Sequence, residues 1–245
     1  MFTLAVISDI HSNLVALESV ITDLKENFKD ITEIYCLGDI VGYGPNPQEC
    51  LEIVLNKEKL ITRIIKGNHD DYVTRHNTPP QVNPSARIAI EYQIQATSLE
   101  FRWELDHLPP CISTKHLDYD ANIVLVHGSP QYPLTEYIYP NTLRQENLFT
   151  YMKDADIDIL FLGHTHIPFV RKLALNKGLK DLLIINPGAV GQPRDNDPRA
   201  SYAIIDVEER DVIIRRVNYD IDLVTKQMES TCLPITLGLR LYQGK

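Results

Sequence analysis

The first third of the chain constrains the fold most, because short apolar segments and amphipathic helical segments alternate along it. Residues 2–8, 34–37 and 60–65 are short, apolar and β-branched, and each ends at a glycine or a polar residue. The apolar periodicity predicts a helix over residues 13–28, capped by Ser12 or Asn13, and a second helix over residues 48–56. This order of strands and helices favours a parallel sheet with its functional groups at the carboxyl ends of the strands.

The remaining chain adds a helical segment and further strands. Residues 84–107 have a helical pattern with few breakers, which predicts an inserted helical pair or a lid. Strands are expected over 112–115, 123–126 and 157–162, with a helix ending near residue 154 between the last two. The segments 169–175, 182–185, 200–207 and 212–217 favour antiparallel strands, and a last helix is expected from Asp220. Because repeats and linkers are absent, we expect residues 1–245 to form one domain with two packed sheets.

Composition limits the classes of partner. The hydrophobic fraction is 44% and the charged fraction 23%, as in ordinary soluble globular proteins. The formal net charge of −9 argues against a nucleic acid polymer or an anionic membrane as the main partner, since both select basic surfaces. A small phosphorylated substrate remains compatible with this charge, because bound metal cations reverse its sign locally.

The cysteines and the first residues bear on the compartment. Cys36, Cys50, Cys111 and Cys232 form no close pair, so neither a zinc knuckle nor a redox dithiol is indicated. Residues 1–6 lack a basic region and run directly into a strand pattern, and no uncharged apolar stretch approaches the ~18 residues that span a bilayer. The simplest expectation is a reducing cytoplasm.

Residues suited to metal binding or proton transfer follow five predicted strands. Five of the eight histidines lie at these strand ends, together with aspartate and asparagine residues. Imidazole nitrogens with carboxylate or amide oxygens, and without thiolates, suit divalent metals such as manganese, iron or zinc. The strand ends carry Asp9, His11, Asp39, Asn68, His69, Asp70, His127, His164 and His166.

The number of candidate ligands favours two metal ions over one. A single structural zinc needs about four ligands, whereas at least seven candidates are expected to converge here. Two metals that share a ligand activate water and bind a phosphoryl group, and a carboxylate is the natural bridge because it has two oxygens. His164 and His166 can converge only if the backbone turns between them, and Gly163 is expected to ease that turn.

These motifs, in this order, resemble those of the calcineurin-like metallophosphoesterase family. The matching segments are Asp9-Ile10-His11, residues 38–42 (GDIVG), residues 67–70 (GNHD), Val126-His127-Gly128 and Gly163-His164-Thr165-His166. Residues 186–195 (NPGAVGQPRD) are similar to the compact, single-domain prokaryotic phosphodiesterase branch of that family. The resemblance implies a four-layer αββα sandwich, in which two packed mixed β-sheets are flanked by helices.

The resemblance also implies roles for individual residues. One metal would bind Asp9, His11 and His166, the other would bind Asn68, His127 and His164, and Asp39 would bridge them. The ions would be two divalent cations such as manganese, iron, zinc or nickel. A hydroxide bridging them would attack a phosphate ester in line, with His69 assisting the leaving group as general acid or charge stabiliser. Asp70 would orient His69 or tune its charge.

Several residues have simpler alternative interpretations. Asp9, Asp39, Asn68 and Asp70 belong to types that also cap helices and stabilise turns. His69 can bind phosphate without donating a proton, and Asn68 is a second candidate substrate contact. Arg194 and Arg199 are candidate phosphate clamps, but pairing with Asp195 or Asp197 is an equal alternative. The tyrosines at 132, 137 and 139 favour loop packing over base stacking.

Three functional alternatives accompany a phosphodiesterase. A nucleotide pyrophosphatase or a protein phosphatase of the same fold would use the same metal ligands. A non-catalytic scaffold of this fold, as in the retromer subunit, would be expected to lose ligands or His69, whereas all are present. No motif encodes the substrate, the native metal pair, the oligomeric state or movement of residues 84–107 as a lid.

Overall fold

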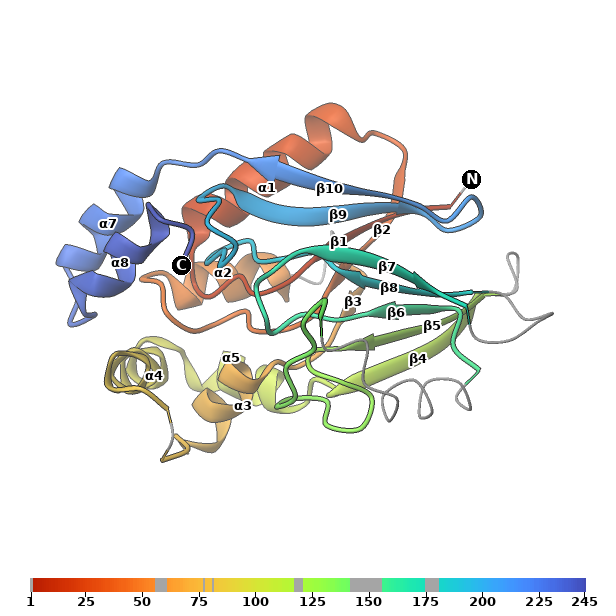
Figure 1. Ribbon diagram of the computed structural model, residues 1–245. Coiled ribbons are helices and arrows are strands. Elements are labelled where there is room, and N and C mark those ends of the chain that lie inside the picture. The colour runs from red at the N-terminus through yellow and green to blue at the C-terminus, as the bar shows by residue number, and fades with distance from the viewer. Residues whose placement is uncertain are drawn as a thin grey trace.

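Two five-stranded sheets form the centre of the computed structural model, which describes residues 2–55, 61–76, 78–80, 82–116, 121–141, 156–174 and 181–245 (Figure 1). The first sheet has the strand order β10-β9-β1-β2-β3, in which β1 to β3 are parallel and β9 and β10 are antiparallel to their neighbours. Its strands are β1 (Thr3–Ile7), β2 (Ile31–Cys36), β3 (Arg63–Ile64), β9 (Ala200–Asp206) and β10 (Asp211–Val217).

The second sheet is also mixed. Its order is β4-β5-β6-β8-β7, with parallel pairing of β5, β6 and β8 and antiparallel strands at both edges. Its strands are β4 (Cys111–His116), β5 (Ala121–Val126), β6 (Ile159–Phe161), β7 (Phe169–Leu173) and β8 (Leu182–Asn186).

Alternation along the strands divides the core into layers. Leu4 and Val6 pack between the two sheets, whereas Ala5 and Ile7 face the opposite side of β1 and pack with α1 (Leu14–Asn27) and α2 (Pro47–Val54). The outer face of the second sheet forms a further cluster that includes Ile138 from the loop after β5. The predicted sandwich of two packed mixed sheets flanked by helices is therefore confirmed.

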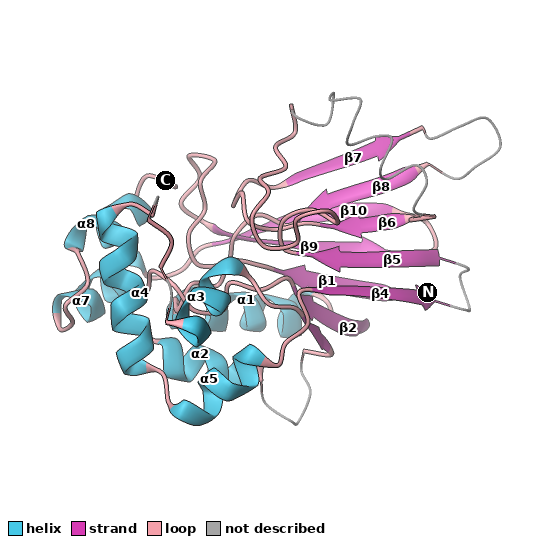
Figure 2. Cartoon of the chain, turned by 90° about the horizontal axis from the view of Figure 1, so that it is seen from below, coloured by secondary structure: helices cyan, strands magenta, loops and turns pink. Residues whose placement is uncertain are grey.

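Five further helices gather at one end of the sheets (Figure 2). The helical pair predicted over residues 84–107 is present as two helices separated by Thr97 and Ser98. Tyr43, Ala86, Ala89 and Met228 belong to one buried cluster, so the helical pair and the C-terminal helices share a core beside residue 43. The helices are α3 (Asn68–Arg75), α4 (Pro84–Ala96), α5 (Leu99–Asp106), α7 (Ile221–Glu229) and α8 (Ile235–Leu241).

The structure corrects several local predictions. Of the strand predicted over residues 60–65, the described residues 61–65 form only the two-residue edge strand β3. The GNHD segment is not a loop, because α3 begins at Asn68. β8 pairs in parallel with β6, so the C-terminal third is not wholly antiparallel. A second C-terminal helix, α8, follows the predicted one. Asn13 caps α1, as one of the two predicted candidates, and α7 begins directly after Asp220, which caps it.

The predicted helix that ends near residue 154 lies outside the described residues. Among the described helices, none combines the length and the apolar character that crossing a bilayer requires.

Candidate metal centre

The sheets bring the predicted ligands together from five segments of the chain. Within the described residues, two groups of side chains place one potential ligand atom each within 4.8 Å of one another. The first ligand group is Asp9, His11, Asp39 and His166. The second ligand group is Asp39, His127 and His164, and the side chain of Asn68 contacts it through His127. Asp39 belongs to both groups.

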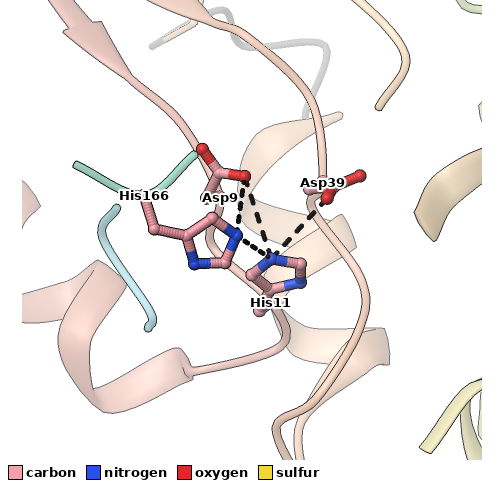
Figure 3. Close-up of side chains that lie close together, drawn as sticks. All are labelled: Asp9, His11, Asp39 and His166. Atoms are coloured by element: carbon pink, nitrogen blue, oxygen red, sulfur yellow. Dashed lines mark hydrogen bonds and ion pairs between the residues drawn. The ribbon is translucent and has the colours of Figure 1, made fainter. Parts of the chain in front are cut away.

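The first ligand group is a cluster of atoms that all carry lone pairs (Figure 3). Nδ1 of His11 lies 3.2 Å from the Val41 carbonyl oxygen, and Nδ1 of His166 lies 2.6 Å from the Gln192 carbonyl oxygen. A carbonyl oxygen only accepts, so both Nδ1 atoms carry the proton when these rings are neutral. The two unprotonated Nε2 atoms then face each other at 3.1 Å.

The Asp9 carboxylate adds one oxygen that no donor among the described residues meets. Asp9 Oδ1 lies 3.3 Å from His166 Nε2, is buried, and has no hydrogen-bond partner among the described residues. A buried acceptor without a donor is costly, and a cation among these atoms would remove that cost. The nitrogen and oxygen donors, the absence of thiolate and the orphaned carboxylate oxygen all fit a divalent metal ion.

The second ligand group has the same chemistry. His127 Nδ1 donates to the Leu37 carbonyl oxygen at 2.8 Å, which directs Nε2 to Asn68 Oδ1 at 3.1 Å and to Asp39 Oδ2 at 3.3 Å. His164 Nε2 is buried without a partner among the described residues. The seven predicted metal ligands are therefore brought together, each with less than a tenth of its surface exposed.

Burial sets the ionisation of these groups. It lowers the pKa of His11 and His166, and it lowers the pKa of His164 to about 3. These rings are therefore neutral near pH 7, which is the form that binds a metal. Burial also lowers the pKa of His127, but the Asp39 carboxylate more than offsets it and the pKa rises to about 9. A proton on His127 thus compensates the negative charge of Asp39, and a bound metal ion would replace that proton.

The backbone of the ligands is strained, which the sequence did not reveal. Asp9, His11, Asp39, His164 and His166 all have φ between +48° and +67°, a region that residues with side chains seldom adopt. Non-glycine residues in this conformation cluster at functional sites, where the surrounding structure holds them. Each of these loops turns sharply after its strand, so that its side chains converge on one point.

Gly163 was expected to ease the turn that brings His164 and His166 together, and this prediction is wrong. Gly163 does not have a positive φ; His164 and His166 themselves make the turn. A Cβ at residue 163 would instead overlap Ser8 Oγ, which donates to Asp9 Oδ2 at 2.7 Å. Similarly, a Cβ at Gly67 would overlap the Asp39 carboxylate. These glycines give the ligands room to approach.

His69 lies beside the first ligand group. Its ring centroid is 4.9 Å from that of His11, and its backbone N–H donates to Asp39 Oδ1 at 2.8 Å. Nδ1 is buried without a partner among the described residues, and burial lowers the pKa of His69 to about 4. A neutral ring at this position can donate an N–H to a substrate oxygen.

Asp70 makes its hydrogen bonds to the backbone. Oδ2 accepts from the Gly67 N–H at 2.9 Å and Oδ1 accepts from the Val41 N–H at 3.1 Å. The carboxylate therefore caps α3 and links it to the loop after β2. No hydrogen bond between Asp70 and the His69 ring is found among the described residues, so any effect on His69 acts through the start of α3.

Aromatic residues that the sequence did not assign line the site. The Tyr43 ring lies 4.7 Å, centroid to centroid, from both His11 and His69, and the Arg194 guanidinium lies over it at 5.6 Å. Tyr137 stacks on His164 at 3.8 Å, so it packs against a ligand and not only within its own loop. The sequence signal for Tyr43 was its position directly after the GDIVG motif at residues 38–42.

The two arginines singled out in the sequence differ. Arg199 forms an exposed ion pair with Asp197, as the alternative interpretation expected. Arg194 donates to Gln192 Oε1 at 2.9 Å and to the Tyr43 hydroxyl at 3.3 Å, and forms no ion pair among the described residues. Of these two arginines, Arg194 therefore remains the candidate phosphate clamp.

Comparison with known proteins agrees with this geometry. Residues 2–210 match the model of the calcineurin-like phosphoesterase superfamily domain. The chain belongs to the calcineurin-like phosphoesterase superfamily. This phosphoesterase is 38% identical to an uncharacterised protein of Methanocaldococcus jannaschii, over 99% of this chain and 98% of the relative.

Two crystal structures resemble this phosphoesterase over its whole length. One is a metallophosphoesterase from Sphaerobacter thermophilus, with 35% identity, a TM-score of 0.81, and coverage of 100% of this chain and 99% of the other. The second is a hypothetical protein from Pyrococcus horikoshii, with 25% identity, a TM-score of 0.86 and the same coverage. The chain is therefore a metal-dependent phosphoesterase, and its Asp and His clusters are suited to divalent metals.

Proposed function

We propose that this enzyme is a dinuclear phosphodiesterase that hydrolyses a small phosphorylated substrate. The observation that carries the proposal is the position of Asp39, whose carboxylate is shared by the two ligand groups. One group alone would already provide the about four ligands of a single metal. The second, with its own orphaned imidazole nitrogen, supports a second ion.

In this proposal, Asp9, His11 and His166 hold one ion, while Asn68, His127 and His164 hold the other. Bound divalent ions supply a water of lowered pKa and offset negative charge on a phosphoryl group. The carbonyl oxygens of Val41, Gln192 and Leu37 fix the rings of His11, His166 and His127, so that each offers Nε2. The residues therefore need little rearrangement when they bind.

His69 is proposed to assist the leaving group. Its ring lies at the edge of the first ligand group and is neutral, so it can donate an N–H to the oxygen on which charge develops. Asp70 is proposed to contribute by fixing the first turn of α3, from which Asn68 and His69 both project. Asn68, His69 and Arg194 are the proposed substrate contacts.

The preference for diesters is supported by the resemblance of residues 186–195 to compact prokaryotic phosphodiesterases. This segment contacts the loop at residues 163–166, which carries two of the proposed metal ligands. Gln192 supplies the carbonyl oxygen that accepts from His166, and Asn186 donates to the Gly163 carbonyl oxygen at 2.8 Å. A cytoplasmic location is part of the same proposal.

A matrix of metals and substrates tests this function. Protein stripped with a chelator is reloaded with manganese, iron, zinc or nickel and assayed on an aryl diester, an aryl monoester, a dinucleoside polyphosphate and a phosphopeptide. We expect activity to require about two equivalents of metal and to be highest on the diester. Full activity with a single equivalent would reject the dinuclear centre, and a clear preference for another substrate would reject the diesterase.

A further inference from the structure

Two half-buried arginines have no ion-pair partner among the described residues. Arg199, Arg215 and Arg216 each pair with an aspartate. Arg194 and Arg240 form no ion pair within the part of the chain that the structure describes. Both are half-buried, so water screens them incompletely. Buried charges are normally paired or bound to a ligand.

The fold brings these arginines to the same place from distant segments. Leu237 and Leu241 of α8 line one small cavity together with Tyr43 and Gln192, the two residues to which Arg194 donates. Arg240 lies three residues after Leu237, and residues with this spacing are neighbours on the surface of a helix. After α8, the Gly244 carbonyl oxygen accepts from the Asn196 N–H at 2.9 Å, which ties this end of the chain to the Arg194 loop.

Donors without acceptors accompany the two positive charges. Arg194 Nε and Gln192 Nε2 are buried and have no hydrogen-bond partner among the described residues. Burial lowers the pKa of Arg240, and electrostatic repulsion from the Arg194 guanidinium lowers it further. An excess of donors and positive charge, without an acidic residue, is the complement of an anion such as a phosphate group.

This cluster lies next to the metal centre and not within it. Arg194 reaches the centre through Tyr43, whose ring contacts His11 and His69. We propose that Arg194, Arg240 and Gln192 form a subsite for a second, non-scissile phosphate group of the substrate. The inference rests on the proposed function for the identity of the scissile phosphate, and it narrows the substrate class to molecules that carry two phosphate groups.

Binding measurements test the subsite independently of turnover. The metal-loaded enzyme is titrated calorimetrically with alkanediol bisphosphates of two to six carbons and with the matching monophosphates. A hydrogen bond to a charged group contributes about 1.5–3 kcal/mol, so we expect the best bisphosphate to bind roughly ten- to a hundredfold more tightly than its monophosphate. The series of lengths accommodates the span between the two phosphate sites.

Three variants assign the effect to Arg240. Arg240→Gln is expected to remove the preference for the bisphosphate, and Arg240→Lys to retain part of it, because lysine keeps the charge but not the fork of donors. Lys226→Gln is the matched control, because it removes one exposed positive charge from the neighbouring helix α7. It should retain the full preference. No preference in the wild type, an unchanged preference in Arg240→Gln, or an equal loss in Lys226→Gln would overturn the subsite.

Hydrolysis separates the subsite from the proposed function. The p-nitrophenyl esters of the same bisphosphates and monophosphates share one scissile bond and one leaving group. We expect the ratio of their kcat/KM values to fall roughly tenfold or more in Arg240→Gln, through KM, because the distal phosphate is bound equally in the ground state and the transition state. A bisphosphate preference in binding without any diester hydrolysis would reject the diesterase and leave the subsite standing.

Discussion

The two ligand groups contain the same kinds of atoms but are supported differently. In the first group, the rings of His11 and His166 each donate to a backbone carbonyl oxygen, which fixes both the tautomer and the orientation. In the second group only His127 has such a support. Within the described residues no hydrogen bond reaches a ring nitrogen of His164, and its ring instead stacks on Tyr137, which is 46% exposed.

This difference indicates how the two sites should behave. A ligand fixed by hydrogen bonds loses little freedom when it binds a metal, whereas a ring supported by one exposed aromatic side chain loses more. We therefore expect the first ligand group to bind its metal more tightly. The side chain proposed to assist the leaving group also lies on that side, because His69 neighbours His11.

The largest effect is expected from a substitution that disrupts both ligand groups at once. Asp39→Ala deletes the one carboxylate that both groups share. We expect metal content to fall well below two equivalents and activity to fall by at least about a hundredfold, because even residues that only support a metal ligand cost 10- to 100-fold when they are replaced. Metal analysis of protein dialysed in metal-defined buffer, with kinetics on an aryl diester, measures both. Wild-type turnover would contradict the bridging role.

A matched pair of single-ligand variants probes the two groups separately. His11→Ala and His164→Ala should each lose about one equivalent of metal, since each removes one ligand of about four. The metal that remains should be the tighter one in His164→Ala and the weaker one in His11→Ala. Dialysis against increasing chelator concentrations measures this order. The opposite order would show that hydrogen-bonded rings do not determine affinity here.

The predicted ligand candidates converge in the structure for a physical reason. Every ligand directly follows a strand or lies within a few residues of its end, and parallel strands place their carboxyl ends at one edge of a sheet. Most strands are short apolar segments and were located to within a few residues, from Thr3–Ile7 to Asp211–Val217. The ligands therefore depend on local sequence and on a topology that local sequence already limits.

Other features depend on packing between distant segments, and the sequence could not supply them. Residue type indicates the positive φ of Asp9 or His166 only weakly, because Asp and His adopt this region more often than most other residues but still seldom. Tyr43 and Gln192 come from distant loops and line one cavity together with Leu237 and Leu241 of α8. The start of α3 at Asn68 did have a local signal, because Asp70 belongs to a residue type that caps helices. In the structure its carboxylate accepts from the Gly67 N–H at the start of α3.

An intermediate effect is expected beside the first ligand group. His69→Ala should retain both metals but reduce turnover roughly a hundredfold, the lower end of what proton transfer or charge stabilisation contributes. The loss should be greatest for esters with poor leaving groups, since those need the most assistance. A series of aryl diesters of increasing leaving-group pKa, assayed at saturating metal, measures the dependence. An equal loss across the series would assign His69 to binding and not to departure of the leaving group.

The smallest expected effect concerns the support of the second ligand group. Tyr137→Ala removes the ring that stacks on His164 at 3.8 Å. Aromatic pairs contribute about 0.5–1.5 kcal/mol beyond the area that they bury, so we expect the weaker metal to bind roughly two- to tenfold less tightly. The first metal should be unaffected. Calorimetric titration of stripped protein with manganese resolves the two affinities.

Tyr132→Ala is the matched control for this effect, because Tyr132 belongs to the same loop and is 54% exposed. Its ring makes no contact with a metal ligand among the described residues. If Tyr132→Ala weakens the second metal as much as Tyr137→Ala does, the loop as a whole and not the stacked ring supports His164. If neither variant weakens it, the position of His164 is set by the backbone turn at residues 163–166, and the two ligand groups are equally rigid despite their different hydrogen bonds.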